Sequence, residues 1–181
     1  MSLRKSIEID PVSLNVQIHN LWKNQWLLLT SGDFNTGHFN TMTVAWGSLG
    51  MMWNKPFAMV VVRPSRYTFD FMNQYPDFTL TAFPKEFHKD LSYLGKVSGR
   101  DEDKIAQTRL HPCAARIIGS PVFQEAELAI ECRKTYWNDF LPDHFLDPTV
   151  RAVHEPKNIH RMYFGEIIHI EGDEKFISTA K

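Results

Sequence analysis

Four side chains able to bind an anion lie within six residues, where an apolar segment meets the start of a predicted helix. Residues 63–68 read RPSRYT. The first backbone N–H groups of a helix have no partners within the helix, and the hydroxyls of Ser65 and Thr68 add donors. Arg63 and Arg66 supply charge-assisted hydrogen bonds. Either these groups hold a phosphate, or Ser65 caps the helix while both arginines point into water.

A second cationic segment, SGRDEDK at 98–104, follows later in the chain. Its three acidic residues suit the first turn of a short helix beginning at Asp101, which again places a cation, Lys104, close to a helix start. Lys104 therefore either reaches the same phosphate or pairs with Asp101 or solvent, as surface lysines commonly do.

A third segment, NTMTVAW at 40–46, has the composition of a strand that flanks a flat ligand. Such a strand offers backbone N–H and C=O groups, the short polar side chains of Asn40 and Thr43, and the large ring of Trp46. Ordinary strand packing is the alternative, because β-branched residues and tryptophan favour strands.

The elements that must position these residues are mostly strands. Apolar runs and alternation predict six strands, at 25–30, 41–47, 57–62, 78–83, 127–134 and 161–171. The strand at 57–62 does not alternate, so we expect it to be buried on both faces. Helices are expected from Ser65, around Leu91 with its end at Gly95, and from Asp101. No regular structure is assigned to 137–160. This pattern favours an antiparallel barrel with peripheral helices, in a single domain covering residues 1–181.

Composition excludes several classes of protein. The 181 residues carry a net charge of −1 and are 43% hydrophobic, which argues against disorder and against a general nucleic-acid surface. No membrane span or secretion signal is expected, and Cys113 and Cys132 are interpreted as small buried thiols in a reducing cytoplasm. Rossmann, P-loop, nucleophile-elbow and zinc-helix motifs are missing from the sequence. The histidines are scattered, so no metal site is expected.

Six segments, taken together and in this order, resemble the flavin reductase-like, FMN-binding split-barrel family, in particular its flavoredoxin-type members. They are NTMTVAWG at 40–47, WNKP at 53–56, RPSRYT at 63–68, SGRDEDK at 98–104, LAIECRK at 128–134 and HRMYFGEI at 160–167. The resemblance runs from about Asn40 to Glu171, and the set of motifs is specific although no single motif is.

The resemblance implies a six-stranded antiparallel split β-barrel with peripheral helices, holding FMN at the interface of a homodimer. Carried over by position, the cofactor-binding residues are Asn40, Met42, Thr43 and Trp46 beside the isoalloxazine ring, Ser65, Arg66, Tyr67 and Thr68 at the phosphate and ribityl chain, and Arg63, Ser98 and Lys104 close to the phosphate. His160 and Tyr163 either approach the flavin or take packing and surface roles.

The activity implied by the resemblance is hydride transfer from NADH or NADPH to FMN, followed by electron delivery to free flavin, a protein partner or another acceptor. Because a flavin carries the hydride chemistry itself, no acid–base constellation is required in the sequence. Two alternatives stay open: a flavoredoxin-like electron carrier or ferric reductase that retains its FMN, and a flavin-binding module without turnover. Neither nucleic acid nor a membrane is expected as a partner.

Overall fold

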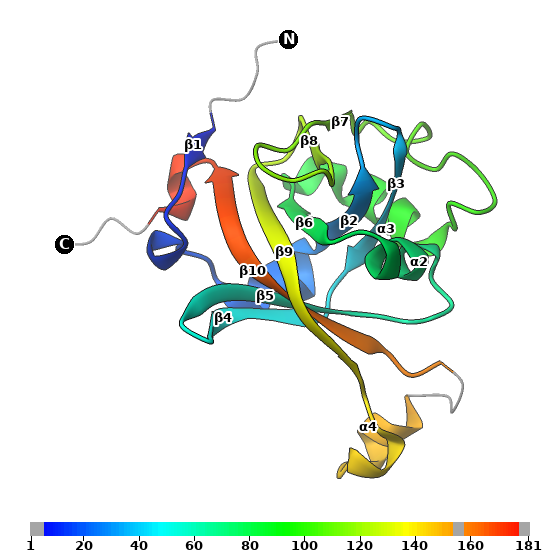
Figure 1. Ribbon diagram of the computed structural model, residues 1–181. Coiled ribbons are helices and arrows are strands. Elements are labelled where there is room, and N and C mark those ends of the chain that lie inside the picture. The colour runs from blue at the N-terminus through cyan, green and yellow to red at the C-terminus, as the bar shows by residue number, and fades with distance from the viewer. Residues whose placement is uncertain (1–5, 154–157, 178–181) are drawn as a thin grey trace.

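The fold is built on one antiparallel sheet of eight strands, seen in a computed structural model that describes residues 6–153 and 158–177. The strands follow the order β3-β2-β6-β9-β10-β5-β4, and β1 pairs with β10 (Figure 1). Their bounds are β1 (Ile7–Glu8), β2 (Leu27–Asp33), β3 (His38–Val44), β4 (Gly47–Met52), β5 (Lys55–Val62), β6 (Asp77–Ala82), β9 (Leu128–Asp139) and β10 (Arg161–Gly172). A separate pair is formed by β7 (Pro112–Cys113) and β8 (Val122–Phe123).

The two edges of the sheet are joined by a very short connection, which shows that the sheet is rolled. β3 ends at Val44 and β4 begins at Gly47, yet these strands lie at opposite ends of the pairing order. The predicted mainly β barrel with peripheral helices is thus confirmed in class, but the strand count of six was too low. β1 and β4 were missed, because the β4 sequence GSLGMM has neither an apolar run nor regular alternation.

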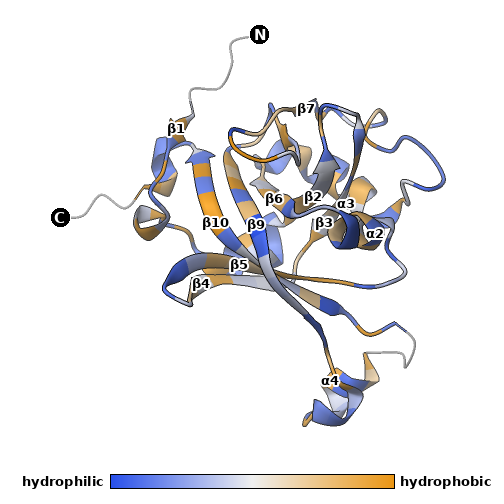
Figure 2. Cartoon of the chain, viewed as in Figure 1, coloured by the Kyte–Doolittle hydropathy of each residue, from blue (hydrophilic) through white to orange (hydrophobic). Residues whose placement is uncertain are grey.

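The main core lies inside this rolled sheet. It contains Leu29, Val60, Phe78 and Ile130, each with no exposed surface. Hydrophobic and hydrophilic residues alternate along β10 in Figure 2, as expected for a strand with one face on the core. The prediction that 57–62 is buried on both faces was wrong: Ala58, Val60 and Val62 are buried, while the residues between them are only partly buried.

The helices are peripheral and differ in detail from the prediction. α3 packs against β3, and α2 packs against β2 and β3 (Figure 1). α3 continues past the predicted end at Gly95. Gly95 lies where α3 approaches Thr43 of β3 closely, so it serves packing and not helix termination. The helices are α1 (Ile18–Asn20), η2 (Leu21–Gln25), α2 (Tyr67–Gln74), α3 (His88–Lys96) and α4 (Pro148–Ala152), with shorter turns η1 (Pro11–Ser13), η3 (Lys85–Phe87), η4 (Pro142–His144) and η5 (Glu174–Phe176).

Two further expectations about local structure were wrong. The segment after Asp101 forms turns and no helix, because Lys104 points inward to α3 and holds the chain there. The segment 137–160, predicted to be irregular, contains the end of β9, η4 and α4, while its residues 154–157 lie outside the described residues. Cys132 is buried as predicted, whereas Cys113 is only partly buried. None of the helices in the described ranges has the length and apolar character of a membrane span.

Candidate functional site

The N-terminus of α2 opens on a cavity of about 60 Å³, which we call the anion cavity. The N-cap residue is Arg66 and not Ser65 as predicted, and no side chain of the described residues caps this helix end. Ser65 instead donates its backbone N–H to Asn158 Oδ1 at 3.3 Å. The anion cavity is lined by Asn40, Met42, Ser65, Arg66, Tyr67, Thr68, Leu94, Lys96, Val97, Ser98 and Lys104.

Lys104 enters the anion cavity as a buried cation. Its Nζ donates to the carbonyl oxygens of Leu94 and Val97, each at 3.0 Å. Those carbonyls lie at the C-terminal end of α3, where the helix dipole favours a cation, so the predicted position at a helix start was wrong. Burial and, secondarily, the charge of Arg66 lower the pKa of Lys104 to about 8. The ammonium therefore changes charge close to physiological pH.

Hydrogen bonds among its neighbours fix the walls of the anion cavity. Asn40 Nδ2 donates to Thr68 Oγ1 at 2.8 Å, joining β3 to the first turn of α2. Arg66 Nη1 donates to Gly95 O at 3.0 Å, joining the same turn to α3. A side chain at Gly99 would collide with Asn40 Oδ1, so only glycine allows the loop after α3 to approach so closely.

A second cavity of about 260 Å³, which we call the ring cavity, adjoins the anion cavity. The two share the lining residues Met42 and Arg66. Arg63 Nε donates to His160 Nε2 at 3.2 Å, and the ring of Trp46 lies 5.1 Å from that of His160. The ring cavity is lined by Met42, Thr43, Val44, Ala45, Trp46, Val61, Arg63, Arg66 and His160.

All eleven residues predicted to bind a cofactor line one or both of these cavities. Thr43, Trp46 and Arg63 line the ring cavity alone, and Met42 and Arg66 line both. The other six line the anion cavity: Asn40, Ser65, Tyr67, Thr68, Ser98 and Lys104. The structure therefore brings together β3 with the residues just after it, the connection between β5 and α2, the start of α2, and the loop after α3.

His160, just before β10, and Tyr163, in β10, were both candidates for contact with the flavin, and the structure places them differently. His160 lines the ring cavity and is buried, with 7% of its surface exposed. Tyr163 lines neither cavity: burial raises the pKa of its hydroxyl, which donates to Asn73 Oδ1 at 2.8 Å. Val61 was missed, because the continuous apolar run at 57–62 gives no signal of which residues face away from the core.

Comparison with known proteins identifies the family of this chain. Residues 23–177 match the family model for the flavin reductase like domain. A flavoredoxin from Methanosarcina acetivorans has a similar fold, with a TM-score of 0.66 and 24% identity over 87% of this chain and 73% of that one. An FMN-binding domain of a flavin reductases-like enzyme from Shewanella baltica has a TM-score of 0.71 and 13% identity, covering 99% of this chain and 83% of that one.

A sequence relative and a third structure extend the comparison. An uncharacterized protein of Archaeoglobus fulgidus is 23% identical over 137 residues, which cover 76% of this chain and 67% of the relative. An NADH:FAD oxidoreductase from Streptomyces globisporus has a TM-score of 0.60 and 13% identity, covering 81% of this chain and 74% of that one. The structural likenesses establish a shared fold, and the family model matches most of the chain. The chain therefore belongs to the flavin reductase-like domain family.

Proposed function

We propose that this protein is a flavin oxidoreductase that binds FMN across the anion and ring cavities, takes hydride from NADH or NADPH, and delivers electrons to free flavin or another acceptor. The observation that carries the proposal is that eleven residues selected from sequence as flavin contacts line two adjoining cavities, which share Met42 and Arg66. A small cavity lined by cations, next to a larger cavity lined in part by the rings of Trp46 and His160, suits a phosphate joined to a flat heterocycle.

The donor set of the anion cavity fits a phosphate. Arg66, Lys96 and Lys104 are three cations among its lining residues, and no Asp or Glu is among the described residues that line it. Arg66 is close enough to contribute to the lowered pKa of Lys104, so the two positive charges repel each other. A phosphate would remove this repulsion and accept hydrogen bonds from the hydroxyls of Ser65 and Thr68 and from the first turn of α2.

The ring cavity contributes positive charge and orientation. FMN, when bound, supplies the capacity to accept a hydride and to pass electrons on. Arg63 and Arg66 bring guanidinium groups to this cavity, where positive charge stabilises a ligand that becomes more negative. Because Arg63 Nε donates to His160 Nε2, the imidazole accepts through that nitrogen and holds the guanidinium in place. Trp46, with 51% of its surface exposed, covers one side of the cavity and remains accessible to a second ligand.

The experiment that tests the function is anaerobic mixing of the FMN-loaded protein with NADH or NADPH, followed by flavin absorbance. Loss of the oxidised flavin band with either nicotinamide, and re-oxidation by added free FMN, is the expected result. Retained FMN without any reduction would instead support a flavin-binding module.

A flavoredoxin-like electron carrier or ferric reductase is the second candidate. Flavoredoxins from Methanosarcina acetivorans and Desulfovibrio vulgaris are both among the similar structures, at 24% and 20% identity. This candidate requires FMN to stay bound through turnover, whereas a reductase of free flavin can exchange it. Visible absorbance that survives gel filtration would favour the electron carrier.

The FMN affinity is expected to fall as the pH rises above about 8. Lys104 has its pKa lowered to about 8, and a bound phosphate dianion would raise it again by favouring the ammonium. Below that pH Lys104 is already protonated in the free protein, and the FMN affinity has its highest value. Above that pH, FMN binding must be accompanied by uptake of a proton, which weakens the affinity by up to about tenfold per pH unit. Fluorescence titrations across this range measure the effect, and riboflavin, which lacks the phosphate, should show no such fall.

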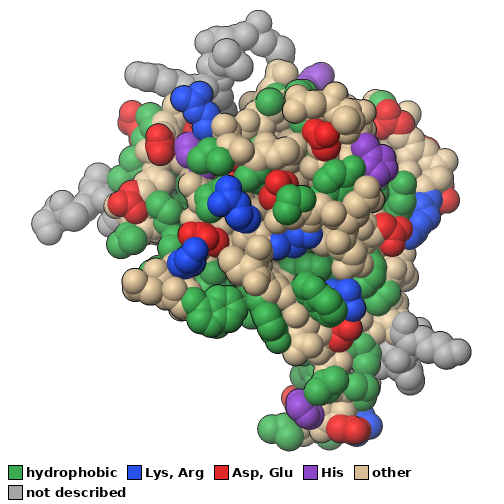
Figure 3. Space-filling view, viewed as in Figure 1, with side chains coloured by type: hydrophobic (Ala, Val, Ile, Leu, Met, Phe, Trp, Pro, Cys, Tyr) green, Lys and Arg blue, Asp and Glu red, His purple; other side chains and the backbone are tan. Residues whose placement is uncertain are grey.

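We also propose that the chain forms a homodimer through the outer face of β4, β5, β9 and β10. Met51, Trp53 and Tyr136 are 60%, 59% and 46% exposed on this face. The rings of Trp53 and Tyr136 lie 6.2 and 5.9 Å from that of Phe164, so they form one apolar patch. Figure 3 shows hydrophobic side chains gathered over β4 and β5. Exposed apolar patches of this kind mark interaction surfaces.

Replacing Tyr136 with lysine is expected to convert the dimer into a monomer, because a charge would be buried in the interface without a partner. Light scattering coupled to gel filtration measures the mass. Ile117→Lys is the matched control, since Ile117 is 54% exposed on a different loop and its substitution should leave the mass unchanged. A monomeric unmodified chain, or a dimer that persists in the Tyr136 variant, would contradict this interface.

A further inference from the structure

Two cavities away from the proposed FMN site share a buried carboxylate, Glu127. Their volumes are about 380 and 480 Å³, within the range of small-molecule sites. Both are lined by Asn20, Gln25, Glu127 and Lys175, so we describe them together as the Glu127 groove. The larger cavity is lined by His88, the first residue of α3, whereas the anion cavity is lined by residues near the end of that helix. None of the described residues that line the Glu127 groove lines the anion or ring cavity.

Glu127 is a fixed hydrogen-bond acceptor in this groove, with 5% of its surface exposed. Its Oε1 accepts from Gln25 Nε2 at 2.6 Å, and its Oε2 accepts from Lys175 Nζ at 2.7 Å. Each carboxylate oxygen can accept two hydrogen bonds, so each has capacity for one more. Because Lys175 already balances the charge of Glu127, this carboxylate suits a hydroxyl group of a ligand better than a cation.

The amides around Glu127 offer donors and acceptors in fixed orientations. Gln25 Nε2 donates to Phe83 O at 3.3 Å as well as to Glu127 Oε1, which uses both of its hydrogens and leaves Gln25 Oε1 as an acceptor. Asn20 Oδ1 accepts from Asn24 Nδ2 at 2.9 Å, which leaves Asn20 Nδ2 as a donor. Hydroxyl groups both donate and accept, so a ligand rich in hydroxyls matches this mixture.

The backbone beside the Glu127 groove is strained. Residues Leu21–Gln25 form η2, a π-helix, which is a rare form that occurs frequently at functional sites. The next residue, Trp26, has φ 62° and ψ 159°, a conformation that residues other than glycine rarely adopt. It is held there because its Nε1 donates to Lys23 O at 3.1 Å and its ring stacks on that of His88 at 4.2 Å. Such strain accumulates at ligand sites, and the proposed FMN site does not account for it, since Trp26 lines neither of its cavities.

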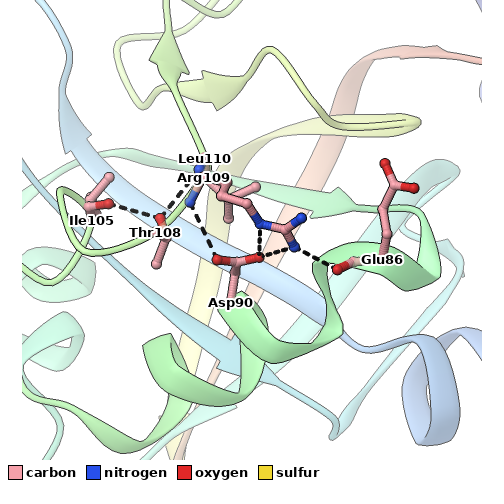
Figure 4. A network of polar contacts seen from close by, with 6 residues as sticks. All are labelled: Glu86, Asp90, Ile105, Thr108, Arg109 and Leu110. Carbon is pink, nitrogen blue, oxygen red and sulfur yellow. Dashed lines mark hydrogen bonds and ion pairs between the residues drawn. The ribbon is translucent and has the colours of Figure 1, made fainter.

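A second cation of the Glu127 groove, Lys85, lies on a turn that the fold holds in place. Lys85 is exposed in η3 and lines the larger cavity. Arg109 donates from Nη2 to Glu86 O at 2.6 Å, and from Nε and Nη2 to Asp90 Oδ2 at 3.1 and 2.6 Å (Figure 4). These bonds fix both η3 and the first turn of α3, so a ligand would not have to order this wall.

We propose that the Glu127 groove binds a small polyhydroxylated anion, the chemistry that sugar acids and sugar phosphates share. Glu127 and Gln25 accept from its hydroxyl groups, and Asn20 donates to them. Lys85 holds the negative charge through charge-assisted hydrogen bonds. The described lining residues include two lysines, Lys85 and Lys175, and one acid, so the local charge favours an anion. This site is separate from the proposed FMN site and does not depend on it.

Calorimetric titrations of the full chain, with excess FMN present to fill the anion cavity, test the site with four probes. Glucuronate and glucose 6-phosphate carry both hydroxyls and a negative charge, glucose carries hydroxyls alone, and inorganic phosphate carries charge alone. We expect one of the two sugar anions to bind roughly tenfold or more tightly than glucose and inorganic phosphate. The tighter of the two shows whether the charged group is a carboxylate or a phosphate.

Three variants locate the binding. Lys85→Gln removes a cation from an exposed position and should weaken the sugar anion by roughly tenfold. Lys89→Gln is the matched control, because Lys89 is exposed on α3, four residues away, and does not line the Glu127 groove. Lys104→Met removes a cation of the anion cavity. The affinity for the sugar anion should stay unchanged in both Lys89→Gln and Lys104→Met.

Four results would overturn the inference. Neither sugar anion binds, or inorganic phosphate binds as tightly as they do. Lys85→Gln and Lys89→Gln weaken binding equally, which would reduce the effect to general surface charge. Lys104→Met abolishes binding while Lys85→Gln does not, which would place the sugar anion in the anion cavity. The FMN affinity is measured separately, so none of these results changes the standing of the proposed function.

Discussion

Replacing Glu131 with alanine is expected to lower the free energy of unfolding by about 2–4 kcal/mol. Glu131 lies in β9 with 2% of its surface exposed. Its two carboxylate oxygens accept backbone N–H groups from Arg116, Ile117 and Ile118 at 2.6, 2.8 and 3.2 Å. Alanine would leave three part-buried backbone donors without their acceptor next to a buried strand. A fully buried unsatisfied donor costs about 1–3 kcal/mol, and water that reaches the exposed residues Arg116 and Ile117 lowers this cost. Urea denaturation followed by tryptophan fluorescence measures the change.

A surface carboxylate provides the control for Glu131. Glu166 pairs with Lys55 at 2.7 Å, but both side chains are partly exposed. Glu166→Ala should therefore change the free energy of unfolding by about 1 kcal/mol or less. Equal losses of unfolding free energy in the two alanine variants would contradict this prediction, because the three backbone hydrogen bonds to Glu131 would then add no more stability than a surface ion pair. The FMN affinity should not respond to Glu131→Ala, since this residue lines neither the anion cavity nor the ring cavity.

The strands that could be predicted are those in which the local pattern of apolar residues indicates burial. β6 and the first half of β9 have apolar residues at alternate positions and lie in the middle of the sheet, so local pattern and position agree. β4 was not predicted, because it lies at a sheet edge and its apolar residues Met51 and Met52 are exposed. When the apolar residues of a strand face a possible partner, they do not alternate with respect to the core of the same chain, and the sequence pattern does not reveal the strand.

The sequence could indicate which residues line the anion and ring cavities, but not how the fold brings each of them there. Arg63, Arg66 and Thr68 were selected because cations and hydroxyls precede a helix, and they do line the cavities at that helix. Lys104 was selected as a cation near another helix start, but it reaches the site by capping the end of α3. The direction in which a long side chain points depends on tertiary contacts, so sequence spacing could identify the residue but not its path.

A cavity of about 690 Å³ next to the start of α2 could not be predicted from the sequence. Tyr67 and Phe71 of α2 form one wall, but the other walls come from the turns at 99–112 and the segment at 37–40, which have no periodic pattern. The turns are shaped by Arg109 and Asp90, which are nineteen residues apart in sequence. Ion pairs at that separation carry no local signal, because any surface arginine and aspartate would look the same in the sequence.

Replacing Lys104 with methionine is expected to weaken FMN by about 1–3 kcal/mol, or roughly 5- to 150-fold, while riboflavin binding stays nearly unchanged. Methionine keeps an unbranched apolar stem of similar length in a position that is 4% exposed, so packing is largely preserved. What is lost is a cation that lines the anion cavity. Riboflavin lacks the phosphate, so the difference between the two ligands isolates the charge. Calorimetric titration of both ligands gives that difference directly.

Lys134 offers a matched control for this substitution because it repeats the structural role of Lys104 elsewhere. Its Nζ donates to Met72 O in the last turn of α2, and burial lowers its pKa to about 8 as well. It lines neither the anion cavity nor the ring cavity. Lys134→Met should therefore destabilise the fold about as much as Lys104→Met does, yet leave the ratio of FMN to riboflavin affinity unchanged. Equal weakening of FMN in both variants would mean that Lys104 acts only by capping α3, and the phosphate would then have to be held by Arg66 and the start of α2.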